Sequence, residues 1–346
     1  MQKEEVVIRL NLEQITKIAK GTVRIDEDNG AVKFYRFTKE QEELYKERSA
    51  DFYKKTFASA GVKLLFKTDS KNLFLKVVMD KGSSRTYFSF DVFVNGKLLD
   101  NLDNFSGIDL PVDYTVTSLQ LGEFSKNFEL GEGEKTVCIY FPWSMQVKLT
   151  ELSIDDGAFI EPISSEKKML TFGDSITQGY DALRPSMRYA ARVAECLGAE
   201  EISKAIGGEV FFPSLAETKE SFAPDYITVA YGTNDWGKKT QKEFVEDCQA
   251  FYTALSKNYP SAQIFAITPI WRKDCYGERE FGIFADIGKE IANAVDSLDN
   301  VTLISGFDFV PKDESYFADL RLHPNDKGFN FYFEKLSAKI MELIRK

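Results

Sequence analysis

The first half of the chain alternates apolar and polar residues over short stretches, which is the pattern of half-buried β-strands. Turn signals separate these stretches. The clearest is Asn95-Gly96, because that pair tolerates the positive φ angles of a tight hairpin. Only one segment, about residues 39–48, has helical character. Short strands joined by turns predict a β-sandwich of the jelly-roll type. The expected strands are 62–67, 72–79, 87–94, 135–141 and 145–154.

After a polar linker around residues 163–166 the pattern changes to alternating short apolar runs and amphipathic helices. This β-α-β-α order predicts an α/β fold with a doubly wound parallel sheet, whose sites lie at the carboxyl ends of the strands. We therefore expect an accessory β-sandwich over 1–162 and a catalytic domain over 163–346. The expected strands are 168–172, 225–230, 263–268 and 301–304, with one more before residue 205, and the helices are 187–197, 240–258, 278–297 and 325–344.

Composition narrows the function classes. A length of 346 residues suggests two domains, and a net charge of −10 disfavours nucleic acid and anionic membrane surfaces as partners. No run of 18 apolar residues occurs, so no membrane-spanning helix is expected. Residues 1–5 lack the layout of a secretory leader, and a cytoplasmic protein with free thiols is expected. The four cysteines are widely spaced, at Cys138, Cys196, Cys248 and Cys275.

The chain contains a single histidine, His323, followed by Pro324. An unperturbed imidazole is the side chain best suited to proton transfer near neutral pH, so any imidazole-based mechanism must use this residue. The alternative is a histidine that only caps the final helix. Pro324 suits the first turn of a helix, which would put His323 in a loop at the carboxyl edge of the sheet.

Ser175 is the candidate nucleophile because it directly follows the first strand of the second half, in Gly173-Asp174-Ser175. A serine hydroxyl needs an adjacent base to become a good nucleophile. A tight turn at Gly173 would let the hydroxyl project toward a ligand, while the backbone N–H faces a developing oxyanion. The alternative is a simple helix N-cap, for which Gly-Asp-Ser is a common signal.

Two further polar blocks follow later strands. Gly207-Gly208 offers a backbone amide that can approach an oxygen closely, and Asn234 offers a carboxamide donor. Each has an alternative interpretation, a turn for the glycines and a helix cap for the asparagine. With Ser175 and His323, however, they supply a nucleophile, a base and oxyanion donors at the strand ends of one sheet.

These four blocks, in this order over about residues 166–346, resemble the serine, glycine, asparagine and histidine blocks of the SGNH (GDSL-like) hydrolases. The resemblance implies a three-layer α/β/α fold with Ser175 as nucleophile and His323 as general base. It also implies an oxyanion hole made by the amides of Ser175 and Gly208 and the side chain of Asn234. Gly208 is preferred to Gly207 because the family glycine is the last in its block.

One position departs from the family pattern. The family usually carries an aspartate three residues before the histidine, whereas here that position is Leu320 and the aspartate is Asp319. Either Asp319 orients His323, or a backbone carbonyl does so and leaves a Ser-His dyad, as in some carbohydrate acetylesterases.

The segment 59–70 resembles the β-domain that precedes some SGNH acyl-esterases, an arrangement similar to carbohydrate esterase family 2. The resemblance implies a cofactor-free and metal-free serine esterase that acts on small acyl esters, chiefly acetyl esters of carbohydrates. Trp236 and Trp271 could stack on a sugar ring or belong to the core. Two other functions stay open: a lysophospholipase or thioesterase with a longer acyl pocket, and a carbohydrate-binding protein with an inactive hydrolase-like domain. A homo-oligomer also stays open.

Overall fold

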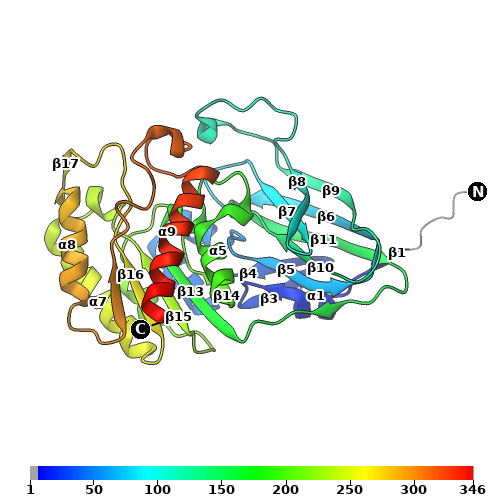
Figure 1. Ribbon diagram of the computed structural model, residues 1–346, viewed down its shortest axis with the longest axis horizontal. Helices are drawn as coiled ribbons and strands as arrows, with labels where there is room; N and C mark the ends of the chain where they lie inside the picture. The colour runs from blue at the N-terminus through cyan, green and yellow to red at the C-terminus, as the bar shows by residue number, and fades with distance from the viewer. Residues whose placement is uncertain (1–6, 346) are drawn as a thin grey trace, which may run out of the picture.

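The computed structural model describes residues 7–345. The expectation that residues 1–5 form no secretory leader concerns residues outside this range. Its first part is a β-sandwich of two antiparallel sheets, on the right in Figure 1. One sheet contains β1 (Val7–Arg9), β3 (Arg24–Asp28), β4 (Ala31–Tyr35), β6 (Asn72–Lys81), β9 (Gly122–Glu129) and β11 (Met145–Asp155). The other contains β2 (Ala19–Lys20), β5 (Lys63–Thr68), β7 (Ser89–Val94), β8 (Lys97–Asp103), β10 (Lys135–Tyr140) and β12 (Glu161–Pro162).

The alternating pattern explains the sandwich, because every second residue of a strand faces the same side. Leu64 and Phe66 of β5 point inward and meet Leu73 and Leu75 of β6 in one apolar core between the sheets. The predicted hairpin is present: β7 and β8 are joined by Asn95 and Gly96, with φ angles of 50° and 76°. These are the positive values that a type I′ turn requires at both central positions.

The expectation of a single helix in this part is wrong. Besides α2 (Lys39–Arg48), the structure contains α1 (Leu12–Ile18) and α3 (Ala50–Thr56). Asn11 caps α1 in a capping box with Gln14, a sequence signal that could have found this helix. Ser49 ends α2 with an extended backbone and caps α3, so one polar residue separates two helices.

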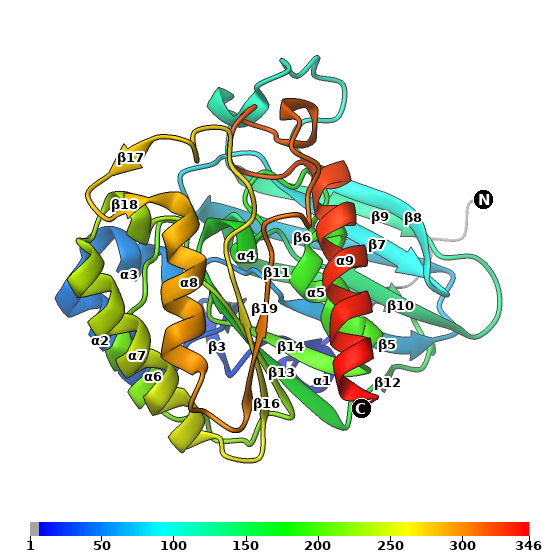
Figure 2. The same cartoon turned by 60° about the vertical axis from the view of Figure 1, so that its left-hand side comes forward.

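The second part is built on a five-stranded parallel sheet in the order β14-β13-β15-β16-β19, which confirms the predicted fold class. Helices cover both faces: α5 packs with α9 on one side, and α6, α7 and α8 pack together on the other (Figure 2). Right-handed crossovers require this, since the chain moves from β13 to β14 in one direction and from β14 to β19 in the other. The strands are β13 (Lys167–Gly173), β14 (Ala199–Ser203), β15 (Tyr226–Ala230), β16 (Gln263–Ile267) and β19 (Val301–Ile304). The helices are α4 (Ser175–Gln178), α5 (Tyr189–Cys196), α6 (Pro213–Glu217), α7 (Gln241–Asn258), α8 (Phe284–Val295) and α9 (Asp326–Ile344).

The helix predicted over 278–297 begins later than expected, at Phe284. Residues 278–283 form a small hairpin of β17 (Glu278–Arg279) and β18 (Gly282–Ile283) instead. Gly282 adopts φ 115°, which a helix cannot contain. Among residues 7–345, no helix is both long and apolar enough to cross a membrane.

Buried polar contacts join the two parts. Arg36 is fully buried and donates to the carbonyl oxygens of Ala58, in the first part, and of Ser203 and Ala205, in the second.

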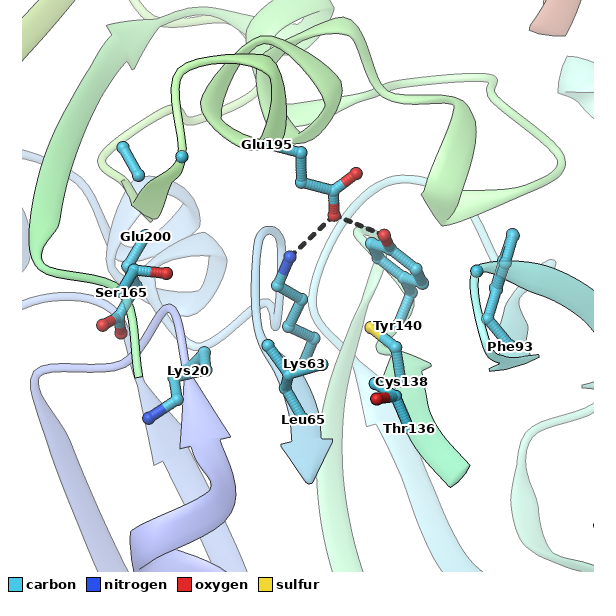
Figure 3. A pocket seen from close by; sticks show the side chains of 13 residues that line it. Lys20, Lys63, Leu65, Phe93, Thr136, Cys138, Tyr140, Ser165, Glu195 and Glu200 are labelled. Atoms are coloured by element: carbon cyan, nitrogen blue, oxygen red, sulfur yellow. Dashed lines mark hydrogen bonds and ion pairs between the residues drawn. The ribbon is translucent and has the colours of Figure 1, made fainter. Parts of the chain in front are cut away.

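At the amino-terminal edge of the parallel sheet, a cavity of about 370 Å³ lies along the boundary (Figure 3). There one oxygen of Glu195, from α5, accepts hydrogen bonds from Lys63 and Tyr140 of the sandwich. The candidate site lies at the opposite, carboxyl edge of this sheet.

Candidate active site

Ser175 lies at the carboxyl end of β13, where the chain turns directly into the short helix α4. The side chain of Asp174 caps this helix by accepting the N–H of Ile176. Gly173 is required at this turn, because a Cβ there would lie 2.1 Å from the Thr177 hydroxyl. At this turn the serine is largely buried, with 4% of the residue exposed.

His323 lies across the sheet edge from Ser175 and contacts it directly. The imidazole Nε2 is 2.9 Å from the Ser175 Oγ, although 148 residues separate the two in sequence. The other ring nitrogen, Nδ1, is 2.8 Å from Oδ2 of Asp319. An Nδ1–H that donates to this carboxylate leaves Nε2 as an acceptor for the serine proton. The three side chains thus have the relative placement of a serine hydrolase triad.

The loop before His323 explains how an aspartate four residues away reaches the imidazole. Leu320 adopts φ 55°, a left-handed conformation that is unusual for leucine and takes up the additional residue. The other oxygen of Asp319, Oδ1, accepts the backbone N–H groups of Arg321, Leu322 and His323. These bonds fix the carboxylate, so the geometry favours Asp319 over a backbone carbonyl as the partner of Nδ1.

Hydrogen bonds and the charge of His323 keep the Asp319 carboxyl ionised. Burial alone would raise the pKa of Asp319, but the hydrogen bond and charge of His323 and two backbone N–H groups hold it well below the ordinary value. Asp319 is therefore ionised at neutral pH. Burial instead raises the pKa of Asp174, next to the serine, to about 7.

The sequence predicts three oxyanion donors, from Ser175, Gly208 and Asn234. The N–H of Ser175 and that of Gly208 have no acceptor among residues 7–345. Gly208 has φ 87°, and the N–H of Gly207 is already donated to Oε1 of Gln178 at 2.7 Å. This difference favours Gly208 over Gly207 as an oxyanion donor.

Asn234 provides the third donor. Its Nδ2 donates one hydrogen to the carbonyl oxygen of Glu209 at 2.9 Å, and an amide group has a second hydrogen to offer. The fully buried Asp235 holds this loop in place by accepting the N–H groups of Gly232 and Phe211. The three donors thus lie on separate loops at one edge of the sheet.

The proposed stacking role of the tryptophans does not fit the structure. Trp236 is fully buried, and its indole N–H donates to the carbonyl oxygen of Gly282. Trp271 is 6% exposed and packs against Phe317. Neither ring presents a free face to a sugar, so both belong to the core, the alternative that the sequence left open.

Pro324 is also placed differently from the expectation. Helix α9 begins at Asp326 with Asn325 as its cap, because the Asn325 side chain accepts the N–H of Gly328. Pro324 therefore precedes the helix and pairs with Phe317 in a short bridge.

Sequence reasoning missed one acidic residue at the site. Asp181 is fully buried, and its Oδ2 lies 3.3 Å from His323 Nδ1. Both of its oxygens are also bound by Arg85, which comes from the β-sandwich part. No motif marks either residue, since the contact arises only when the two parts pack together.

Comparisons with known proteins agree with this fold. Residues 171–330 match the GDSL-like Lipase/Acylhydrolase family, which confirms the resemblance drawn from the four blocks and the prediction of an ester-hydrolysing enzyme. A search of the curated proteins found no match.

Solved structures are similar over nearly the whole chain. A salicylyl-acyltransferase from a tetracycline biosynthetic pathway has a TM-score of 0.78 at 18% identity, and covers 99% of this chain and 98% of its own. A putative GDSL-like lipase from Bacteroides ovatus has a TM-score of 0.76 at 19% identity, covering 98% of each chain. A family two carbohydrate esterase from Clostridium thermocellum, solved with cellohexaose, has a TM-score of 0.65 at 16% identity, covering 94% of this chain and 99% of its own. At these identities the similarity shows a shared fold.

Proposed function

We propose that the GDSL-like hydrolase domain, over residues 171–330, hydrolyses small acyl esters in two steps with Ser175 as nucleophile and His323 as general base. The observation that carries this proposal is the continuous contact from the Ser175 Oγ to His323 Nε2, and from His323 Nδ1 to Asp319. The proposed roles need no cofactor, since nucleophile, base and oxyanion donors all come from the chain.

In the first step the Ser175 Oγ forms a bond to the ester carbonyl carbon while its proton passes to His323 Nε2. The carbonyl oxygen becomes an oxyanion, which the N–H groups of Ser175 and Gly208 and the Asn234 amide stabilise. When the intermediate collapses, the bond to the alcohol oxygen breaks and His323 returns the proton to the leaving alcohol. Asp319 stays ionised and stabilises the imidazolium that forms in between.

In the second step a water molecule repeats this sequence on the acyl-enzyme. Its oxygen bonds to the acyl carbon as His323 takes a proton, and the bond to the Ser175 Oγ then breaks. The proton returns to the serine, so a carboxylic acid leaves and the enzyme is restored.

We further propose acetyl esters of carbohydrates as the substrate class. Two observations support this choice: the low exposure of Ser175, which favours a small acyl group, and the similarity to the family two carbohydrate esterase.

We also propose a reducing, cytoplasmic location, which the cysteines support. All four are free, and Cys138, Cys248 and Cys275 are buried.

The test is a turnover series on nitrophenyl esters of increasing acyl length and on acetylated oligosaccharides. We expect the highest kcat/KM with acetyl, release of acetate from the oligosaccharides, and loss of both activities in Ser175→Ala. A fluorophosphonate probe should label the wild type at Ser175. A preference for long acyl chains would replace the acetylesterase assignment with the lysophospholipase or thioesterase alternative. Absence of labelling and turnover would favour the inactive binding protein.

A further inference from the structure

We propose that Asp181 is a second carboxylate partner of His323 Nδ1, held in place by the β-sandwich, so that the imidazole is positioned by two acidic residues rather than one. This inference rests on the proposed function. It assigns a positioning role to Asp181 and, through it, to Arg85 and Tyr87.

The position of Asp181 is defined by contacts on all sides of its carboxylate. Oδ1 accepts hydrogen bonds from Arg85 Nε at 2.7 Å and from the Tyr87 hydroxyl, and Oδ2 accepts from Arg85 Nη2 at 2.9 Å. Oδ2 also lies 3.3 Å from His323 Nδ1. The side chain is fully buried, where a carboxylate needs partners of opposite charge. Arg85 is that partner, and it binds both oxygens of the carboxylate beside the imidazole.

The β-sandwich part also fixes the backbone around Asp181. The Tyr114 hydroxyl donates to the carbonyl oxygen of Asp181, and the Trp143 indole N–H donates to that of Ala182 at 2.8 Å. Tyr180 packs between the rings of Trp143 and His323, with centroid distances of 4.7 and 5.7 Å. The segment that carries Asp181 is thus held against His323 by residues from the other part of the chain.

The two carboxylates have unequal roles at Nδ1. Asp319, at 2.8 Å, accepts the single Nδ1 proton, and Asp181, at 3.3 Å, adds a second negative charge when the ring becomes an imidazolium. If Asp319 is neutralised, Asp181 is close enough to accept the same proton. This arrangement predicts that each carboxylate partly compensates for loss of the other.

A bound cation is the competing explanation, because one donor atom from each of Asp181, Asp319 and His323 lies within 4.8 Å of the others. Arg85 argues against it, since a guanidinium already binds both oxygens of Asp181. The charged groups that act on the imidazole are then Asp319, Asp181 and Asp174, with Arg85 and Tyr87 behind Asp181.

The experiment is a double-mutant cycle with Asp181→Asn and Asp319→Asn, measured on nitrophenyl acetate. We expect Asp181→Asn to lower kcat about tenfold and Asp319→Asn about 10²-fold, less than the roughly 10⁴-fold loss when a triad aspartate has no substitute. The double variant should lose about 10⁴-fold, about ten times more than the product of the single effects. KM should change little. Active enzyme is counted with the fluorophosphonate probe, so that a smaller folded fraction does not count as a smaller kcat.

The pH profile separates positioning from a structural role. Asp181→Asn removes a negative charge beside the imidazole and so disfavours its protonation, which should shift the acidic limb of kcat/KM to lower pH. Asp299→Asn, which removes the same charge from an exposed position, should leave this limb unchanged. Dialysis of the wild type against EDTA should leave turnover intact.

Three results would overturn this inference: single effects that simply multiply, a wild-type acidic limb in Asp181→Asn, or loss of activity with EDTA. Its failure is distinguishable from that of the proposed function. Turnover that survives in Ser175→Ala would contradict the serine mechanism, whereas an inactive Ser175→Ala with an unaffected Asp181→Asn would remove only the role of Asp181.

Discussion

At the scale of single residues, the proposed oxyanion hole depends on which hydrogen-bond donors the fold leaves without an acceptor. Asn234 donates one amide hydrogen to the Glu209 carbonyl oxygen, and the proposed mechanism uses the other. Among residues 7–345 the N–H of Gly208 has no acceptor, whereas the N–H of Gly207 donates to Gln178. Such donors cost nothing to orient during the reaction, since the fold has already placed them.

Replacing Asn234 by alanine tests this directly. Loss of one oxyanion donor should lower kcat by about 10²–10³-fold with a small change in KM, because the donor acts mainly on the charge that develops in the transition state. The measurement is steady-state turnover of nitrophenyl acetate. Asn258→Ala, which removes a side-chain amide that binds backbone carbonyls far from the site, should keep wild-type turnover. Similar kcat values for the two variants would exclude Asn234 from the mechanism.

At this scale, sequence alone could predict the pairing of Ser175 with His323, but not every partner of these residues. Ser175, Gly208, Asn234 and His323 each follow a strand, and parallel strands end at one edge, so their convergence was predictable. Asp319 stood one position away from the family pattern, and only the left-handed backbone of Leu320 shows how it reaches Nδ1. Asp181 and Arg85 lie 96 residues apart in segments without motifs, and so their pairing required the structure.

Among the elements, α9 links the loop that carries His323 to the rest of the second part. It begins just after His323, and in its first turn Asp326 accepts the N–H of Leu183 through Oδ1 at 2.9 Å. Element positions were largely predictable, because the hydrophobic periods of α7 and α9 are long and regular. Boundaries were less so, as the late start of α8 after a hairpin shows. Short helices such as α1 and α3 depend on their caps more than on periodicity.

Asp326 predicts a pH dependence of stability. Burial raises its pKa to about 7, so the folded protein favours the protonated carboxyl. Stability from this group is present below the ordinary pKa of about 4 and is lost as the pH rises through about 7. In Asp326→Asn, which cannot ionise, the free energy of unfolding should fall less between pH 5 and pH 8 than in the wild type, by about 1–3 kcal/mol. Urea denaturation at the two pH values measures this, with the exposed Asp299→Asn as a control that should match the wild type.

At the scale of the whole molecule, the two parts share buried groups and one apolar core. Phe37, Tyr87 and Trp143 of the first part belong to the same buried cluster as the core of the parallel sheet. Lys204, fully buried in the second part, pairs with Glu220 and donates to the backbone oxygen of Arg36. Either part alone would therefore expose apolar side chains and buried polar groups that the other part now covers. The parts could be predicted from their hydrophobic patterns, but this shared interior could not, because its members are distant in sequence.

A shared interior predicts cooperative unfolding of the whole chain. Arg36→Met removes the donor to four carbonyl oxygens on both sides of the boundary, three of them in buried bonds, and buried acceptors without partners each cost about 1–3 kcal/mol. We therefore expect the free energy of unfolding to fall by about 3 kcal/mol or more, with a single transition retained. Far-ultraviolet circular dichroism reports on both parts. Tryptophan fluorescence reports on the boundary through Trp143, and on the second part through Trp236 and Trp271. A single cooperative transition should therefore give the same midpoint with both probes. Arg9→Met, which removes an exposed arginine, should change the midpoint little. Two separate transitions in the wild type would show instead that the sandwich and the hydrolase domain fold independently, and that the contacts of Arg36 do not couple them.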